Sequence, residues 1–409
     1  MEFVNGVLQF DQFMALTLGI VVLFIGKRIN GSVRFLREFS IPEPVTGGLI
    51  ASVLLGILYA LTGTVVEFDL WFRDLLLVYF FTTIGINASL RDLVTGGKPL
   101  LILVVITVGY MFVQNLTGVG VMTLFGFPAQ SGVIAGTVSL IGGHGTAIAW
   151  APKLAEDYGI SNAMEMGVAC ATFGLILASL QGGPVARFLI SRHKLTPATT
   201  EPIDVGISEE QPQEKIEPYV LLDAILAVHV SMILGYGFND FVIKGIIGID
   251  LPAFVACLLA GIFLTNIRVP PRFRISGREW PTRTPSIALI ADMSLGAFLA
   301  MSLMSMQLAS IASLAGPVLA VLLAQVFVAL AVNLFIVFPA MGRNYDAAVV
   351  CAGFGGISLG ATPTAMANMS AVTQRYGPSH LAFIVVPLVC AFFIDLANAL
   401  IIPFFLNAF

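Results

Sequence analysis

Ten long apolar stretches, each about twenty residues in length, constrain this chain more than any other feature of its sequence. A helix rises about 1.5 Å per residue, so about twenty apolar residues cross the roughly 30 Å hydrocarbon core of a bilayer. Charged residues make up only 11% of the chain, too few to cover a water-soluble surface. We therefore predict an all-α integral membrane protein whose ten transmembrane helices lie at about residues 7–26, 44–63, 72–90, 99–121, 163–186, 219–237, 251–267, 286–308, 317–339 and 381–405.

Two further apolar stretches, 131–150 and 347–369, carry their glycines in the middle, where a spanning helix is expected to be strongest. Interrupted backbone at membrane depth is tolerated where it lines a site or is buried in protein. We predict that both stretches are re-entrant hairpins, at about residues 128–155 and 347–372, which dip into the membrane and return to the side they entered.

The positions of lysine and arginine support this topology. If the N-terminus lies outside and both hairpins return, only Arg73, Lys153 and Lys244 among the 20 Lys and Arg lie outside. A full crossing by either hairpin would invert every later loop and remove the bias. We therefore predict that both termini are periplasmic or extracellular. The charge pattern contains no basic patch that indicates a nucleic-acid partner.

The chain divides into two similar halves, 1–186 and 219–409, joined by an acidic, proline-containing cytoplasmic linker at 187–218. Thr146-Ala147 matches Thr364-Ala365, and Tyr158-Gly159 matches Tyr376-Gly377, at one offset of 218 residues. Each half holds five spans, so the halves lie in opposite orientations, as in the inverted repeats of secondary transporters. The match is strongest in spans three to five and eight to ten, which predicts a core of these spans and a frame of spans one, two, six and seven.

The hairpin tips are the strongest candidates for a substrate site. Glycine lets backbone amides and carbonyls approach a ligand closely, and exposed helix N-termini attract carboxylates. The predicted substrate-binding residues are Gly142, Gly143, His144, Gly145, Thr146, Gly360, Thr362, Pro363 and Thr364. For His144, both a substrate contact and a structural hydrogen bond stay open. The alternative for the glycines is close helix packing, but two clusters at matching places favour a site.

Polar side chains inside the spans are candidates for binding a cation. Asp395 and Asn398 lie one turn apart on one face of the tenth span. Three roles stay open for them: ligands of Na⁺, partners of a substrate ammonium, or a structural hydrogen bond. Asn115, Asn333 and Glu165 complete the predicted sodium site. The two asparagines also fit bridges between helices, and Glu165 also fits an interfacial position. We predict no metal beyond Na⁺, no organic cofactor and no catalytic residues.

Several motifs resemble the bacterial glutamate:sodium symporter family over nearly the whole chain. They are Ile41-Pro-Glu-Pro-Val-Thr-Gly-Gly48, Gly142-Gly-His-Gly-Thr146, Ala169-Cys-Ala-Thr-Phe-Gly174, Gly182-Gly-Pro-Val-Ala-Arg187, Asn344-Tyr-Asp-Ala-Ala348, Leu359-Gly-Ala-Thr-Pro-Thr-Ala365 and Phe392-Phe-Ile-Asp395. The resemblance implies Na⁺-coupled uptake of L-glutamate, a homodimer in the lipid of the bacterial inner membrane, and an elevator-like movement. The chain departs from the usual family residues at Ala147, Phe354 and Ser358.

Two other functions stay open on the sequence. A Na⁺-coupled transporter of another amino or dicarboxylic acid needs the same hairpin tips. A passive channel with two pore loops is the alternative from a different class, because channel filters also use glycine-rich loops. An enzyme is not expected, because the four histidines form no His-Glu-x-x-His motif and no catalytic set is present.

Overall fold

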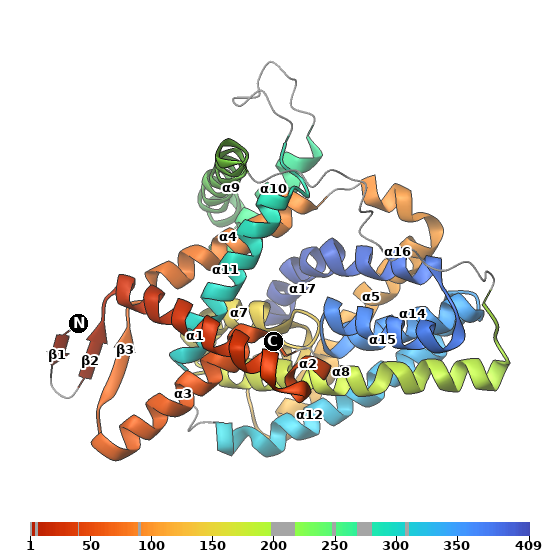
Figure 1. The fold of residues 1–409 in the computed structure, drawn as a ribbon, viewed down its shortest axis with the longest axis horizontal. Helices are drawn as coiled ribbons and strands as arrows, with labels where there is room; N and C mark the ends of the chain where they lie inside the picture. Colours follow the sequence, from red (N-terminus) through yellow and green to blue (C-terminus); the bar gives the residue numbers. More distant parts are fainter. Residues whose placement is uncertain are drawn as a thin grey trace. The chain divides into compact units, whose positions relative to one another are not determined.

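The computed structural model describes residues 2–4, 7–39, 41–88, 91–197, 217–247, 251–267, 280–306 and 311–409 (Figure 1). The elements follow in chain order as β1 (Glu2–Val4), β2 (Val7–Phe10), α1 (Gln12–Ser32), α2 (Arg34–Glu38), α3 (Glu43–Thr62), β3 (Val65–Phe68), α4 (Trp71–Asn87), α5 (Arg91–Leu124), α6 (Ala129–Val133), η1 (Ile134–Val138), α7 (Gly143–Tyr158), α8 (Ala163–His193), α9 (Pro218–Phe238), η2 (Asn239–Ile247), α10 (Ala253–Asn266), α11 (Pro285–Met304), α12 (Ile311–Val332), η5 (Asn333–Val337), α13 (Phe338–Ala340), α14 (Tyr345–Leu359), α15 (Thr362–Tyr376), α16 (His380–Leu388), η6 (Val389–Phe393) and α17 (Ile394–Ala408). The elements labelled η are π-helices.

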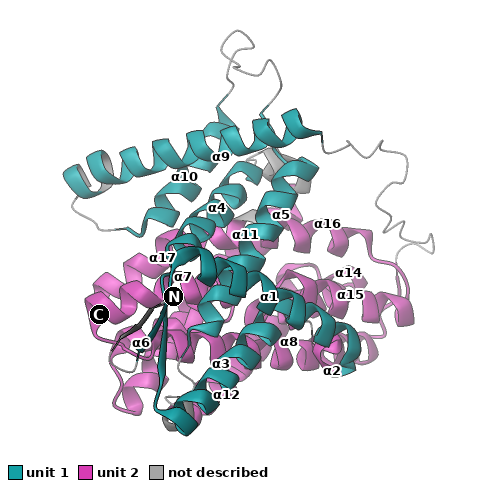
Figure 2. Cartoon of the chain, turned by 60° about the vertical axis from the view of Figure 1, so that its left-hand side comes forward, with its two compact units in different colours: residues 1–34, 42–90, 208–308 teal, residues 35–41, 91–207, 309–409 magenta. Residues whose placement is uncertain are grey.

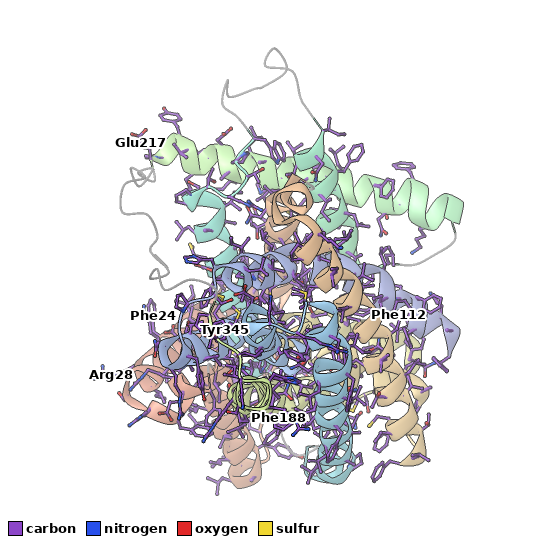
Figure 3. All side chains as sticks on the ribbon, turned by 90° about the vertical axis from the view of Figure 1, so that its right-hand side faces the viewer. Phe24, Arg28, Phe112, Phe188, Glu217 and Tyr345 are labelled. Atoms are coloured by element: carbon purple, nitrogen blue, oxygen red, sulfur yellow. The ribbon has the colours of Figure 1, made fainter. Side chains whose placement is uncertain are left out.

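Each predicted span coincides with a helix or with a run of consecutive helices. Seven of the described helices are long and apolar enough to cross a membrane, judged by length and composition. Three further apolar helices, of 10 to 17 residues, are α10, α14 and α17. Large apolar side chains such as Phe24, labelled in Figure 3, are exposed on the helices. The chain is therefore an α-helical membrane protein with seven to ten candidate spans.

The start of the first span differs from its prediction. Residues 7–10 form β2, which pairs antiparallel with β1 and parallel with β3 in a three-stranded sheet. Helix α1 begins only at Gln12, because the Asp11 carboxylate accepts hydrogen bonds from the amides of Phe13 and Met14, both at 3.0 Å. An N-cap of this kind satisfies amides that have no partner inside the helix. The protein is thus not purely helical.

The chain forms two compact units, coloured separately in Figure 2. Unit 1 contains residues 1–34, 42–90 and 208–308, and unit 2 contains residues 35–41, 91–207 and 309–409. Each unit therefore takes helices from both halves of the sequence. The predicted division into core and frame is wrong at two places, because α4 and α11, the third and eighth spans, belong to unit 1 with the predicted frame.

Unit 1 is held together by close helix contacts at small residues. A Cβ on Gly47 of α3 would lie 2.1 Å from the carbonyl oxygen of Val22 in α1. A Cβ on Gly85 of α4 would lie 2.2 Å from the carbonyl oxygen of Leu258 in α10. Glycine is therefore required at both positions, as expected where helix backbones approach each other in a membrane. Close helix packing accounts for glycine at these two positions.

Unit 2 contains both predicted hairpins. The first hairpin consists of α6, η1 and α7, and the second consists of α14 and α15, which lie side by side in Figure 1. The arms of the second hairpin are antiparallel, because a Cβ on Gly356 would meet Ala365 and a Cβ on Gly353 would meet Met369. Helix α8 packs against α7, α14 and α15.

The predicted linker, 187–218, begins inside a helix. Helix α8 continues to His193, and α9 begins at Pro218. Residues 198–216, which carry most of the acidic residues of this segment, lie outside the described residues.

Candidate functional site

The first hairpin is unwound just before its tip. Gly136 in η1 has φ −108° and ψ −128°, which is not helical and breaks the helix. The side-chain oxygen of Asn115 in α5 accepts a hydrogen bond of 2.9 Å from the amide of Thr137. A Cβ on Gly136 would lie 2.4 Å from that oxygen, so the bond requires glycine. The break therefore exposes backbone groups that Asn115 partly satisfies.

A second asparagine reaches the same backbone from the last span. The amide of Asn398 in α17 donates a hydrogen bond of 3.3 Å to the Thr137 carbonyl. Both Asn115 and Asn398 are buried. The side-chain oxygens of Asn398, Thr137 and Ser139 are also buried and have no hydrogen-bond partner among the described residues. Such orphaned oxygens cost about 1–3 kcal/mol each unless a ligand satisfies them.

Oxygen atoms of this kind are the ligands that hard cations prefer. Na⁺ resembles Ca²⁺ and Mg²⁺ in favouring carbonyl, hydroxyl and carboxylate oxygens over nitrogen or sulfur. The Thr137 hydroxyl and the Asn398 side-chain oxygen belong to two residues that are already joined by a hydrogen bond. Asp395 lies one helical turn before Asn398 and is half-buried. The chemistry of these oxygens therefore fits Na⁺.

The second hairpin has a short tip between two regular helices. Helix α14 ends at Leu359, Ala361 is extended with φ −156° and ψ 169°, and α15 begins at Thr362. Pro363 lies in the first turn of α15, where a missing amide hydrogen breaks no helix bond. The amides of Thr362 and Thr364 are among the first-turn donors that have no partner inside the helix. The Thr364 hydroxyl is buried and has no hydrogen-bond partner among the described residues.

Side chains from two long helices satisfy carbonyls at the end of α14. The side-chain amide of Gln114 donates a hydrogen bond of 2.7 Å to the Ser358 carbonyl, and the Tyr110 hydroxyl donates one of 3.3 Å to the same oxygen. Gln181 of α8 donates 2.8 Å to the Gly355 carbonyl. The last carbonyls of a helix lack intrahelical donors, and water is absent from a membrane interior. These contacts allow a helix to end inside the unit.

Helix α8 contacts both hairpin tips at a single glycine. A Cβ on Gly174 would lie 2.4 Å from the Leu359 carbonyl oxygen and 2.9 Å from the Leu140 side chain. Leu140 belongs to the tip of the first hairpin, and Leu359 is the last residue before the tip of the second. The two tips therefore meet along one short stretch of α8.

Sequence comparison identifies the family. The family described as sodium/glutamate symporter matches residues 8–378. The chain belongs to the sodium/glutamate symporter family. Members of this family are transporters and not enzymes.

Curated relatives cover nearly the whole chain. It is 40% identical over 402 residues to the sodium/glutamate symporter of Escherichia coli (strain K12), which covers 97% of both proteins. It is 41% identical over 394 residues to that of Haemophilus influenzae, covering 95% of this chain and 96% of the relative. The structure of the sodium proton antiporter MjNhaP1 from Methanocaldococcus jannaschii aligns over 95% of this chain and 96% of its own, with 13% identity and a TM-score of 0.41.

The predicted substrate residues lie at the starts of α7 and α15, with one shift from the prediction. The predicted tip at 142–146 is the N-cap and first turn of α7, and the turn itself is formed by residues 139–142. Gly143 has φ +71°, a conformation that other residues rarely adopt. His144 is buried, and its Nε2 lies 2.9 Å from the hydroxyl of Thr172 in α8. This contact supports the hydrogen-bond interpretation of His144.

The predicted sodium residues are only partly brought together. Asn115 and Asn398 meet at Thr137, as described above. Asn333 instead donates 2.8 Å to the Cys351 carbonyl in α14, so each asparagine of the pair Asn115 and Asn333 joins a span to the hairpin that follows it. Glu165 is buried in the first turn of α8, with one carboxylate oxygen lacking a hydrogen-bond partner among the described residues. Because the first turn of α8 is also the end of a span, both explanations of Glu165 stay predictions.

Several residues of the site were missed by the sequence analysis. They are Tyr110, Thr137, Ser139 and Gln181, which carry the contacts and unpaired oxygens described above. The usable signal is an uncharged polar side chain within a predicted span, such as Gln181.

Proposed function

We propose that this chain carries L-glutamate into the cell together with Na⁺, by alternating access across the bacterial inner membrane. The match to the family over residues 8–378 and the 40% identity to a sodium/glutamate symporter over 97% of both proteins support this function. The structural observation that carries the proposal is the meeting of both hairpin tips at Gly174 of α8. A solute held between the tips is in reach of both helix starts.

The starts of α7 and α15 are the proposed carboxylate sites. Each helix begins directly after a hairpin tip, so its first amides and the positive end of its dipole are available to an anion. Glutamate carries two carboxylates, which matches two such helix starts. Gly142 to Thr146 at the start of α7, and Gly360 and Thr362 to Thr364 at the start of α15, are the proposed substrate residues.

The proposed Na⁺ site lies at the unwound backbone of the first hairpin. Thr137 and Asn398 supply oxygens that have no hydrogen-bond partner among the described residues, and Asp395 supplies charge one turn away. Asn115 holds the backbone of Thr137 in place. Na⁺ bound there stiffens the first hairpin, so Na⁺ and glutamate each improve the affinity for the other by the same factor.

The proposed topology consists of two inverted five-span repeats with re-entrant hairpins and both termini outside. The arms of the second hairpin are antiparallel and have 15 residues each, which supports a segment that turns back inside the membrane. The division into two units supports an elevator-like movement, in which unit 2 carries the hairpins and unit 1 anchors a homodimer.

Uptake by purified protein in liposomes tests the proposal. We expect accumulation of radiolabelled L-glutamate above its external concentration when Na⁺ is high outside, and none when choline replaces Na⁺. Accumulation that does not depend on Na⁺ would contradict the coupling. Flux that only equilibrates the solute would favour a channel, and a panel of competing amino and dicarboxylic acids tests the choice of glutamate.

A further inference from the structure

An open cavity of about 870 Å³ lies between α8 and α15, away from the hairpin tips. Its α8 side is a single helix face, because Gly183, Arg187 and Ser191 recur every four residues, and so do Pro184, Phe188 and Arg192. Its α15 side is formed by the last turns of that helix, which contribute Arg375 and Tyr376. Both helices belong to unit 2.

Three arginines give this cavity a strong positive charge. Arg187, Arg192 and Arg375 form no ion pair with a carboxylate among the described residues, and Arg375 lies over the Tyr376 ring at 5.5 Å. The C-termini of α8 and α15 each contribute about half a negative charge, which is less than the three guanidinium charges together. The cavity therefore attracts an anion.

The length of α8 places this cavity at the depth of lipid headgroups. Its 31 residues extend about 46 Å, which exceeds the roughly 30 Å hydrocarbon core by about ten residues. If α8 enters the core with its first turn, residues 184–193 lie in the headgroup layer, on the cytoplasmic side in the proposed topology. Phe188, labelled in Figure 3, is 55% exposed and adds an apolar surface beside the arginines.

We propose that this cavity binds the phosphate of an anionic phospholipid headgroup. Guanidinium groups form two parallel hydrogen bonds with phosphate oxygens, and basic pockets between helices on the cytoplasmic side suit such headgroups. Ser191 and Tyr376 add hydroxyl donors, and Phe188 contacts the apolar part of the lipid. Because the phosphate contacts both α8 and α15, the bound lipid stabilises the packing of α15, the second arm of the second hairpin, against α8. Free inorganic phosphate is the other source of the same chemistry.

Lipid titration of the purified full-length protein, followed by native mass spectrometry, tests this proposal without Na⁺ or glutamate. Its result is therefore independent of transport. We expect phosphatidylglycerol to bind at least about tenfold more tightly than phosphatidylcholine. The triple variant Arg187→Gln/Arg192→Gln/Arg375→Gln should lose this preference. The matched control Lys27→Gln/Arg28→Gln/Lys98→Gln removes the same charge from the proposed cytoplasmic side and should keep it.

Additional variants and a competition experiment separate the possible outcomes. Replacing the three arginines by lysine keeps the charge but removes the paired hydrogen bonds, so we expect an affinity for phosphatidylglycerol between those of the unchanged protein and the glutamine variant. The lysine variant should also disturb folding less than the glutamine variant. Equal losses in the glutamine variant and the control, or an unchanged glutamine variant, would overturn the proposal. Displacement of phosphatidylglycerol by millimolar inorganic phosphate would assign the cavity to the soluble anion instead.

The acidic residues after α8 provide one more control, because their carboxylates carry the same sign of charge as a phosphate. In a variant with Glu201, Asp204, Glu209, Glu210 and Glu214 changed to amides, unchanged affinity for phosphatidylglycerol supports the lipid. A tenfold rise would mean that a carboxylate of this chain already occupies the cavity, and would overturn the assignment.

Discussion

The side-chain amide of Asn398 donates a hydrogen bond of 3.3 Å to the backbone carbonyl of Thr137, across 261 residues of sequence. This bond joins the last span of the chain to the unwound backbone of the first hairpin. It leaves the Asn398 oxygen and the Thr137 hydroxyl buried without a hydrogen-bond partner among the described residues. The pair is the centre of the proposed cation site.

Asn398→Ala should raise the Na⁺ concentration for half-maximal glutamate uptake by about tenfold or more. Removing one oxygen ligand and the bond to Thr137 costs about 1.4 kcal/mol or more of Na⁺ binding, which corresponds to that factor. Uptake measured over a series of Na⁺ concentrations gives the value. Asn407→Ala, at an exposed position of the same helix, is the control and should match the unchanged protein.

Asp395→Asn should weaken Na⁺ activation while leaving the protein folded. The substitution keeps the shape of the side chain but removes the negative charge one turn from Asn398. Asp157→Asn is the control, because the exposed Asp157 forms an ion pair of 2.7 Å with the partly buried Lys153, and surface ion pairs contribute little. If Na⁺ activation of Asp395→Asn were the same as that of the control, Asp395 would have no part in the cation site.

Gly136→Ala should abolish most transport. The new Cβ would lie 2.4 Å from the side-chain oxygen of Asn115 and would displace it from the Thr137 amide. The matched control is Gly120→Ala in α5, where nothing lies within 4 Å of the new Cβ and helix propensity improves by about 1 kcal/mol. Equal uptake rates in the two variants, at equal amounts in the membrane, would contradict the role of Gly136.

His144 and Thr172 should act as one unit. Thr172→Val and His144→Phe each remove one side of the 2.9 Å contact, and each should raise the glutamate concentration for half-maximal uptake severalfold. The double variant should be no worse than the more affected single variant, because residues in one hydrogen bond are not additive. Full additivity in this cycle would show that the two residues act separately.

Asp11 should make the first turn of α1 sensitive to acid. The hydrogen bond from the Met14 amide is the largest cause that lowers the pKa of Asp11 below its ordinary value of 3.8. A lowered pKa in the folded state means that the cap stabilises α1 above about pH 3.8 and that this is lost as pH falls through the folded-state value.

Hydrogen exchange of the amides of residues 13–16, corrected for intrinsic rates, measures this effect. Protection should fall with acid in the unchanged protein. Asn is also a good N-cap but does not titrate, so Asp11→Asn should keep protection that does not depend on pH. Acid-induced loss of protection in Asp11→Asn would exclude Asp11 as the cause.

The sequence was sufficient for the α-helical membrane class and for the positions of the apolar helices, because apolar length is a local feature. It placed Pro363 correctly in the first turn of a helix. It could not show that the first hairpin is already unwound at Gly136, before the turn at residues 139–142, because a glycine inside an apolar run is also compatible with a regular helix. Which carbonyl Gln114 or Gln181 satisfies depends on tertiary packing, and no local pattern carries that information.

The interleaving of the two units has a consequence for how the protein is made. Unit 2 requires residues 91–207 and 309–409, so α5 and α8 leave the ribosome long before α14 and α15 exist. During that interval Gln181 has no Gly355 carbonyl to bind, and the glycines of α8 face no second hairpin. A chain truncated after the linker therefore leaves polar groups such as the Gln181 amide unsatisfied in the membrane, and we expect quality-control proteases to recognise it. Only synthesis of residues 309–409 satisfies these groups.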